Sequence, residues 1–362
     1  MKKILIVITT GFVSCGGLTS VMMNYYKKID KSKYIIDFAS TNKELDDDLK
    51  KELEGNNSKY YALGNRKRNL LAYEKNLYNV IKNNSYDIIH VNANSATASF
   101  ELILAKILKV EKRIVHIHTS ICDHRILHKL LSPIFNNLYT DAIACSHKAG
   151  SWIFDDGKFT ILNNGIDTQR FRFDENSRKL VRRKFNISDD CILLGHVGKL
   201  YKPKNHLFLV DIFKNIHKDN SNTKLLLVGD GEMRPEIEDK VEKLHLKDAV
   251  IFAGMQTHVE DFMSAMDYFL FPSLWEGLPL SVVEAQASGL KCLVSDTIDA
   301  SVCVTNTIEM KSIDTIKPWL IYYDKILLSD RKKQSDDNIE SIKNVGYDST
   351  MNVTKLEQIY DL

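Results

Sequence analysis

The 362-residue sequence predicts an α/β fold with two doubly wound parallel sheets, and two observations lead to this prediction. First, short runs rich in β-branched residues recur along the chain, each followed by a longer amphipathic segment. These runs are apolar on both faces, as strands are when helices cover both sides of a parallel sheet. Second, the alternation occurs once in each half of the chain. The sequence therefore predicts two Rossmann-like domains in tandem, facing a central cleft.

In the first half, the segments that predict strands are KILIVI (3–8), YIIDFAS (34–40), YDIIHVN (86–92), RIVHIHT (113–119), AIACS (142–146) and FTILNN (159–164). Those with helical spacing are 18–29, 69–83 and 98–109. In the second half, the predicted strands are CILLGHVG (191–198), KLLLVGDG (224–231), VIFAG (250–254), YFLFPS (268–273) and KCLVSD (291–296). The predicted helices are near 205–217, 233–244, 259–266 and 280–288.

The junction between the two domains is expected where strand signals vanish and charge rises, near residues 168–184. We therefore expect an N-terminal domain at 1–170 and a C-terminal domain at 171–345. A polar, helical pattern continues from residue 312 to the end. We expect its last helix, about 346–362, to pack back on the N-terminal domain.

Composition indicates an ordinary soluble globular protein, with 44% hydrophobic and 27% charged residues. No apolar run approaches the roughly 18 residues that a transmembrane helix needs. The six cysteines form no CxxC pair and no zinc spacing, which favours reduced thiols in a cytoplasmic protein. Net charge is only +2, and we expect no nucleic-acid partner. The N-terminal half is basic, which suits an anionic membrane surface, a phosphorylated acceptor or simply an unevenly solvated surface.

Ligands of doubly wound domains bind at the carboxyl ends of the strands, so motifs there carry the most weight. Gly16 and Gly17 follow the first predicted strand and precede a helix, where free backbone N–H groups can meet an anion. The spacing is not GxGxxG, and a plain turn is the alternative. His116 and His118 are two residues apart, so a strand directs both to the same side. His118 is nearer the carboxyl end, although a buried core histidine is the alternative.

Lys199 and Lys204 follow the first strand of the second domain, with Gly198 allowing close backbone approach. Two ammonium groups near one turn suit a diphosphate, at roughly 1.5–3 kcal/mol for each charge-assisted bond. Solvated loop lysines are the alternative. Gly229 and Gly231, which follow the next strand, predict either a structural turn or the floor of a cleft.

The stretch SLWEGLPLSVVEAQASG (273–289) contains Glu276 and Glu284 with seven residues between them. Pro279 predicts the first turn of a helix and Gly289 its end. Glu284 is then on the helix and Glu276 in the loop before it. Carboxylates accept hydrogen bonds from hydroxyls, so the two could bind the sugar and the ribose of one ligand. Metal ligation is disfavoured because no third ligand stands at suitable spacing, while an acid/base pair stays open.

With these motifs in order, the chain resembles the retaining glycosyltransferases of family GT4, which have the GT-B fold. The motifs that carry the resemblance are TTGFVSCGGLTSVMMN, NNGIDTQRF, GHVGKLYKPKNH, LLLVGDGEMRPEIE and FPSLWEGLPLSVVEAQASGL. The last contains the E-x7-E signature of the family. Within this family, the chain resembles the EpsF-like enzymes of bacterial capsular and exopolysaccharide synthesis.

The resemblance implies a role for each site residue. Gly16 and Gly17 would line the donor phosphates, and His118 would contact the donor sugar as a catalytic residue. Lys199 and Lys204 would neutralise the leaving diphosphate, although position 199 is often arginine, whose bidentate fork lysine lacks. Glu276 would bind sugar hydroxyls and Glu284 the ribose. The remaining donor-binding positions would be Gly198, Gly277, Leu278, Pro279 and Leu280.

The resemblance also implies the partners. The donor would be a nucleotide sugar, with UDP expected before GDP, and no metal cofactor is expected. The acceptor would be a lipid-linked sugar or an oligosaccharide at the inner face of the plasma membrane. The basic segments 27–33 and 64–69 could provide peripheral contact with anionic lipid. The alternatives are another GT-B enzyme, such as a nucleotide-sugar epimerase or a glycoside phosphorylase, and a non-catalytic nucleotide-sugar binding subunit.

Overall fold

The computed structural model describes residues 1–14, 16–119, 122, 125–154, 157–320 and 328–362. The chain divides into two compact units, an N-terminal unit of residues 1–165 with 349–362, and a C-terminal unit of residues 166–348. The predicted divisions were at 170/171 and 345/346. Cysteines 122, 145, 191, 292 and 303 are free thiols, and Cys15 lies outside the described residues.

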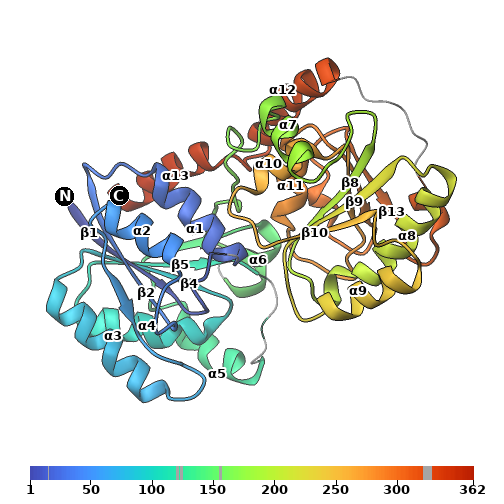
Figure 1. Ribbon diagram of the computed structural model, residues 1–362. Coiled ribbons are helices and arrows are strands. Elements are labelled where there is room, and N and C mark those ends of the chain that lie inside the picture. Colours follow the sequence, from blue (N-terminus) through green and yellow to red (C-terminus); the bar gives the residue numbers. More distant parts are fainter. Residues whose placement is uncertain (15, 120–121, 123–124, 155–156, 321–327) are drawn as a thin grey trace. The chain divides into compact units, whose positions relative to one another are not determined.

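A seven-stranded parallel sheet forms the centre of the N-terminal unit, in the order β3-β2-β1-β4-β5-β6-β7 (Figure 1). Its strands are β1 (Lys2–Ile8), β2 (Tyr34–Ser40), β3 (Tyr60–Ala62), β4 (Ile88–Ala93), β5 (Lys112–Ile117), β6 (Asp141–Ala144) and β7 (Thr160–Ile161). Because the chain moves outward from β1 in one direction and then returns to β4 on its other side, β1 and β4 flank the topological switch point.

The sheet of the C-terminal unit repeats this order over six parallel strands, β10-β9-β8-β11-β12-β13. Its strands are β8 (Ile192–Val197), β9 (Thr223–Val228), β10 (Val250–Gly254), β11 (Tyr268–Phe271), β12 (Lys291–Ser295) and β13 (Ile308–Lys311). Here β8 and β11 flank the switch point. Both units are therefore Rossmann-like, which confirms the predicted fold class.

Helices connect the strands, as parallel pairing requires. Those of the N-terminal unit are α1 (Gly17–Lys28), α2 (Asp47–Gly55), α3 (Leu70–Asn84), α4 (Ser99–Ile107), α5 (Arg125–Phe135), α6 (His147–Ile153) and α13 (Ser349–Asp361), with the 3-10 turn η1 (Ala96–Ala98). Those of the C-terminal unit are α7 (Glu175–Lys184), α8 (His206–Asp219), α9 (Arg234–Lys243), α10 (Val259–Ala265), α11 (Leu280–Ala287) and α12 (Leu328–Asn344), with the 3-10 turns η2 (Lys202–Lys204), η3 (Ala300–Val302) and η4 (Lys317–Trp319).

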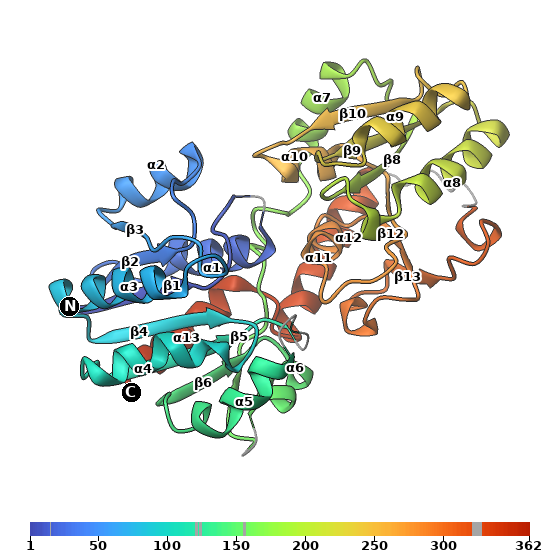
Figure 2. The same ribbon diagram turned by 90° about the horizontal axis from the view of Figure 1, so that it is seen from below.

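The C-terminal helix α13 belongs to the N-terminal unit, where it lies beside α1 (Figure 1). Lys2 at the start of β1 donates to the carbonyl oxygen of Tyr360 at 2.7 Å. In the C-terminal unit, α12 lies beside α11 (Figure 2). No helix among the described residues is long and apolar enough to span a bilayer.

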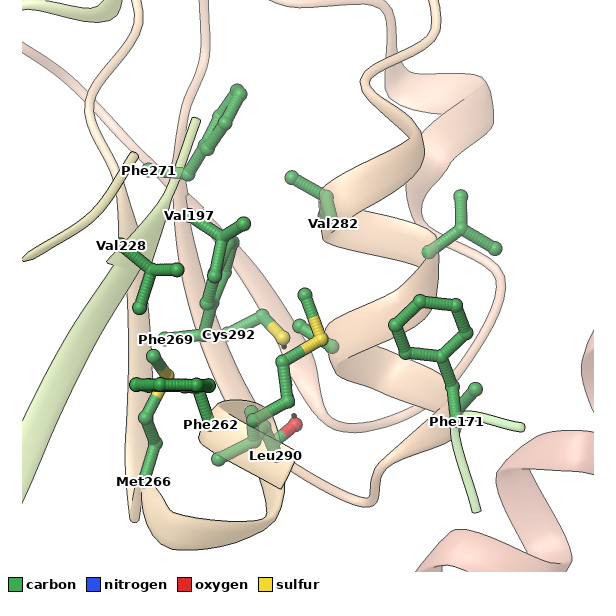
Figure 3. Packing of buried hydrophobic residues seen from close by; sticks show 14 of the residues in the cluster. Phe171, Val197, Val228, Phe262, Met266, Phe269, Phe271, Val282, Leu290 and Cys292 are labelled. Carbon is green, nitrogen blue, oxygen red and sulfur yellow. Dashed lines mark hydrogen bonds between the residues drawn. The ribbon is translucent and has the colours of Figure 1, made fainter. Parts of the chain in front are cut away.

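The core of the C-terminal unit fixes the helix that carries Glu284. Figure 3 shows Val282 of α11 directed toward the aromatic and aliphatic side chains of the central strands, among them Val197 and Phe269. All three side chains are buried. Helix α11 ends in a Schellman motif, in which Gly289 adopts φ 68° and the N–H of Leu290 bonds to the carbonyl of Ala285. Gly289 is the helix end that the sequence predicts.

Candidate functional site

The candidate site of the C-terminal unit is at the switch point of its sheet. The loop after β8 carries Lys199 and Lys204, and the loop after β11 carries Glu276. The N–H of Leu274 donates to the carbonyl of Pro203 at 2.8 Å, which joins the two loops. Residues 72 positions apart in the chain are brought together in this way, since parallel strands end at the same edge of a sheet.

Lys204 and Glu276 form a largely buried ion pair, with 2.8 Å between Lys204 Nζ and Glu276 Oε1. The side chains are 10% and 16% exposed. The ammonium also lies 4.3 Å from the ring centroid of Phe271 at the end of β11, as a cation–π contact. Burial lowers the pKa of Lys204, while the Glu276 carboxylate opposes that shift. Two groups of opposite charge, each able to bind part of a phosphorylated sugar, are thus already held together.

Lys199 has a different environment from Lys204. Its side chain is 63% exposed, and its Nζ is 4.0 Å from an oxygen of Glu232. An exposed pair at that distance contributes little. The two lysines follow the same strand as predicted, but only Lys204 is buried against Glu276.

Gly198 provides space for Lys204. A side-chain carbon at this position would be 3.2 Å from Lys204 Cε and 3.3 Å from His196 Nε2. The close approach of the next strand needs glycine as well, since Gly229 has φ 133° and a side-chain carbon there would be 2.1 Å from the Gly198 carbonyl oxygen. The glycines of both motifs therefore bring two loops close together around the lysine.

Helix α11 begins beside this loop, at the residues predicted to bind the donor. Pro279 is the N-cap residue, one position before the predicted first turn, and no side chain caps the helix. Gly277 is exposed, and a side chain at its Cβ position would meet open space. Leu278 and Leu280 are partly buried against the core. The first N–H groups of an uncapped helix have no partner within the helix, so they can bind an anion.

Glu284 on α11 has other neighbours than Glu276. Burial raises the pKa of Glu284 to about 7, Arg170 lowers it and Glu260 raises it further. Arg170 and Glu260 form an ion pair of 2.7 Å and line a polar hollow of about 320 Å³. The carboxyl group is thus close to half protonated near neutral pH, and it can both donate and accept a hydrogen bond.

In the N-terminal unit, Gly16 and Gly17 are at the start of α1, as the sequence predicts. Gly16 is the N-cap residue and Gly17 the first residue of the helix, which has no side-chain cap. A side-chain carbon at Gly17 would meet no atom within 4 Å, whereas one at Gly16 would be 3.1 Å from the carbonyl oxygen of Val13. The backbone at the first residue of α1 is therefore open to a ligand.

His118 follows β5, immediately after its last residue. Its Nε2 is 2.8 Å from Asn92 Oδ1, and its Nδ1 is 3.1 Å from Asn164 Oδ1. Burial lowers the pKa of His118 to about 4, so the ring is neutral at pH 7. A neutral imidazole has a single N–H, so His118 donates to only one of these two amide oxygens. The rings of His116 and His118 are 3.9 Å apart, on the same side as predicted.

Sequence reasoning missed Asn92, Asn164 and Phe271. Asn92 could have been found, because His90 and Asn92 alternate in β4 as His116 and His118 do after it, and β4 neighbours β5. Asn164 gives no such signal, since it follows the short strand β7 in a loop. Phe271 ends β11 in a run that reads as apolar core, and its contact with Lys204 depends on the loop that carries the lysine.

Within the described ranges, no group of three or more histidine, cysteine, aspartate or glutamate residues could hold a metal ion. Asp46, the first of the three aspartates at 46–48, caps α2 by accepting from the N–H of Leu49 and also binds Ser14. Asp46 therefore has a structural role at the start of α2.

Two family models match the chain in the order of the two units. "Glycosyltransferase Family 4" matches residues 16–170, and "Glycosyl transferases group 1" matches residues 192–310. Among curated proteins, EpsF of Bacillus subtilis (strain 168) is named as a glycosyltransferase. It is 28% identical over 96% of this chain and 94% of the EpsF chain. An Escherichia coli relative, UDP-Gal:alpha-D-GlcNAc-diphosphoundecaprenol alpha-1,3-galactosyltransferase, is 27% identical over 78% of this chain and 77% of its own.

Solved structures agree in fold. HepE of Anabaena in complex with UDP and glucose has a TM-score of 0.75 at 15% identity, over 99% of both chains. Sucrose-phosphate synthase of Thermosynechococcus elongatus has a TM-score of 0.75 at 15% identity, over 100% of this chain and 98% of its own. At such identity the likeness establishes the fold alone.

Proposed function

The chain belongs to the family 4 glycosyltransferases, which have the GT-B fold, and its relatives act in polysaccharide biosynthesis, and on this basis we propose a reaction for it. It transfers a sugar from UDP to an acceptor hydroxyl with retention of configuration. The observation that carries the proposal is the buried Lys204–Glu276 pair at the switch point of the C-terminal sheet. A diphosphate would take Lys204 as its partner, and sugar hydroxyls would take Glu276. Binding of the donor would thus replace the Lys204–Glu276 ion pair by two contacts, one from Lys204 to the diphosphate and one from Glu276 to the sugar.

The chemistry that these residues support is stabilisation of the leaving group. The acceptor oxygen bonds to the anomeric carbon as the bond from that carbon to the diphosphate oxygen breaks. The electron pair of that bond goes to the diphosphate, which also takes the acceptor proton. Lys204 and the uncapped start of α11 stabilise the developing negative charge. Lys199 adds a second, solvent-exposed cation.

Sugar and ribose recognition completes the donor site. Glu276 binds sugar hydroxyls with the backbone of Gly277 to Leu280, and Glu284 binds the ribose. In the N-terminal unit, His118 contacts the sugar, and Gly16 and Gly17 approach the phosphates. Asn164, at 3.1 Å the more distant of the two amides on His118, is the partner that a sugar hydroxyl replaces.

We propose a lipid-linked acceptor on the basis of the Escherichia coli relative, whose name gives a sugar on diphosphoundecaprenol. The exposed side chains of α5 support contact with a membrane surface, since Ile126 and Leu130 are 80% and 70% exposed beside Lys129. Part of the predicted basic surface is paired internally, as Lys27 with Glu52 and Arg66 with Glu101.

Transfer of radiolabelled sugar tests the proposed function. We expect the chain to move label from a UDP-sugar, rather than a GDP-sugar, to a lipid-linked or oligosaccharide acceptor, and to do so in the presence of EDTA. Altered sugar without any acceptor would indicate an epimerase. Binding of donor without transfer to any acceptor in a broad panel would indicate a non-catalytic subunit.

A further inference from the structure

A row of buried polar side chains runs from helix α13 to His118 within the N-terminal unit. The hydroxyl of Tyr360 is 2.7 Å from His90 Nδ1, and His90 Nε2 is 3.3 Å from His116 Nδ1. The ring of His116 then lies 3.9 Å from that of His118, tilted by 35°. Four side chains from β4, β5, the loop after β5 and α13 thus form one continuous series.

Alternation along the strands places the row on one face of the sheet. Val91 and Val115 belong to the apolar core on the other face, so their neighbours His90 and His116 are directed toward the face that α13 covers. His116 is paired in register with Asn92, which is itself bonded to His118. Both His90 and His116 are 0% exposed.

The row has one consistent direction of hydrogen bonding. Burial lowers the pKa of His90 to about 3 and that of His116 well below its usual range, so each ring is neutral and has one N–H. Tyr360 donates to His90 Nδ1, and the His90 proton is then on Nε2, from which it is donated to His116. In the opposite direction the phenol hydrogen would have no acceptor, since the described residues give that hydroxyl His90 as its partner.

This direction places the remaining proton of His116 on Nε2, which has no hydrogen-bond partner of good geometry among the described residues. The backbone of Leu162 is near enough to raise the pKa of His116, but burial outweighs it. A buried donor without a full partner costs about 1–3 kcal/mol. An apolar side chain would fill the same space without that cost. Packing alone therefore does not account for the row.

We propose that Tyr360, His90 and His116 are positioning residues that hold the ring of His118 in place. This inference rests on the proposed function, because it assumes that His118 contacts the donor sugar. His116 supports one face of the ring while Asn92 fixes its edge. Helix α13, which ends the chain, thus contributes Tyr360 to the setting of a residue 242 positions earlier.

Tyr360→Phe tests the proposal with a matched control. Tyr34→Phe removes a phenol hydroxyl from the same interface, where Tyr34 contacts the Tyr360 ring and binds Asp361 at 2.7 Å. We expect Tyr360→Phe to lower kcat by about tenfold with little change in the donor KM, since small misplacements of a reacting group are costly. In protein with ¹⁵N-labelled histidine, the ring signals of His118 should also move. Tyr34→Phe should change neither.

Equal kcat losses in both variants would mean that the hydroxyls only stabilise α13, and would overturn the proposal. Unmoved His118 signals in Tyr360→Phe, or an unchanged kcat, would overturn it as well. His118→Ala separates the two levels of inference. If that variant keeps full turnover, the proposed role of His118 fails. If it is inactive while Tyr360→Phe behaves as wild type, the function stands and the positioning role fails.

Discussion

The two units have the same strand order but differ in the polar groups at the carboxyl edges of their sheets. At the carboxyl edge of the sheet in the C-terminal unit, Lys204 and Glu276 form a buried ion pair. At the carboxyl edge of the sheet in the N-terminal unit, the neutral ring of His118 is held between two amides and lies against a row of neutral rings. The difference suggests that the two edges bind the donor through different kinds of contact. In the proposed function, Lys204 meets the diphosphate and Glu276 accepts hydrogen bonds from sugar hydroxyls, while the uncharged His118 offers the sugar a hydrogen bond only.

Loss of the lysine should have the largest effect on the charged edge. Lys204→Met keeps the length of the side chain but removes its charge. We expect kcat/KM to fall on the order of 10³-fold, because stabilisation of the leaving diphosphate is lost. The measurement is transfer of radiolabelled sugar. Lys199→Met is the matched control and should lose no more than about tenfold, since Lys199 is solvent-exposed. Comparable losses in the two variants would contradict the distinction between them.

Glu276→Ala should separate binding from turnover at the same edge. The variant should lose on the order of 10²-fold in kcat, because contacts to the donor sugar are gone. UDP lacks the sugar, so its affinity should stay within a fewfold of wild type. Titration can follow the fluorescence of the neighbouring Trp275, which is 58% exposed. Full activity in this variant would remove the role assigned to Glu276.

The neutral state of His118 should be visible in how the activity of a His118 variant depends on pH. The pKa of His118 is lowered to about 4, so its protonation state is constant from pH 6 to 8. We expect His118→Gln to lower kcat by about tenfold to 10²-fold by an equal factor across that range. A loss that varies strongly between pH 6 and 8 would mean that His118 titrates during turnover and that the edge is not neutral.

A smaller effect is expected on stability at Glu284. Its folded-state pKa of about 7 is above the usual 4.5, so the native state binds more protons between these values. Stability of the wild type should therefore fall as pH rises from about 4.5 to 7. Glu284→Gln removes this penalty and should be more stable by about 1–3 kcal/mol at pH 8, with little difference at pH 4.5. Chemical denaturation without donor measures it. Equal stabilities at pH 8 would contradict the raised pKa of Glu284.

The smallest effects concern the membrane. Binding to vesicles that contain anionic lipid should weaken as salt is added, because each exposed basic side chain contributes about 1 kcal/mol near the surface. Arg68→Gln and Lys129→Gln should each weaken binding by roughly fivefold in a sedimentation assay. Absent or salt-insensitive binding would remove the proposed electrostatic contact.

Much of the fold could be predicted from sequence, because buried parallel strands are apolar on both faces. The runs 34–40 and 250–254 match β2 and β10 in full. Strands β3 and β13 were missed, since they are short and only partly buried edge strands. In the candidate site, the motif order placed Lys204 and Glu276 at one edge. Their burial, and the exposure of Lys199, depend on loop closure that residue spacing does not encode.

The most direct test of the central claim compares the affinity of UDP with that of uridine, which lacks the diphosphate, in wild type and in Lys204→Met. We predict that the wild type binds UDP much more tightly than uridine. In Lys204→Met the affinity for UDP should fall by at least tenfold while that for uridine is unchanged, so that the preference largely disappears. An unchanged preference for UDP in this variant would contradict the assignment of the diphosphate to the switch point of the C-terminal sheet.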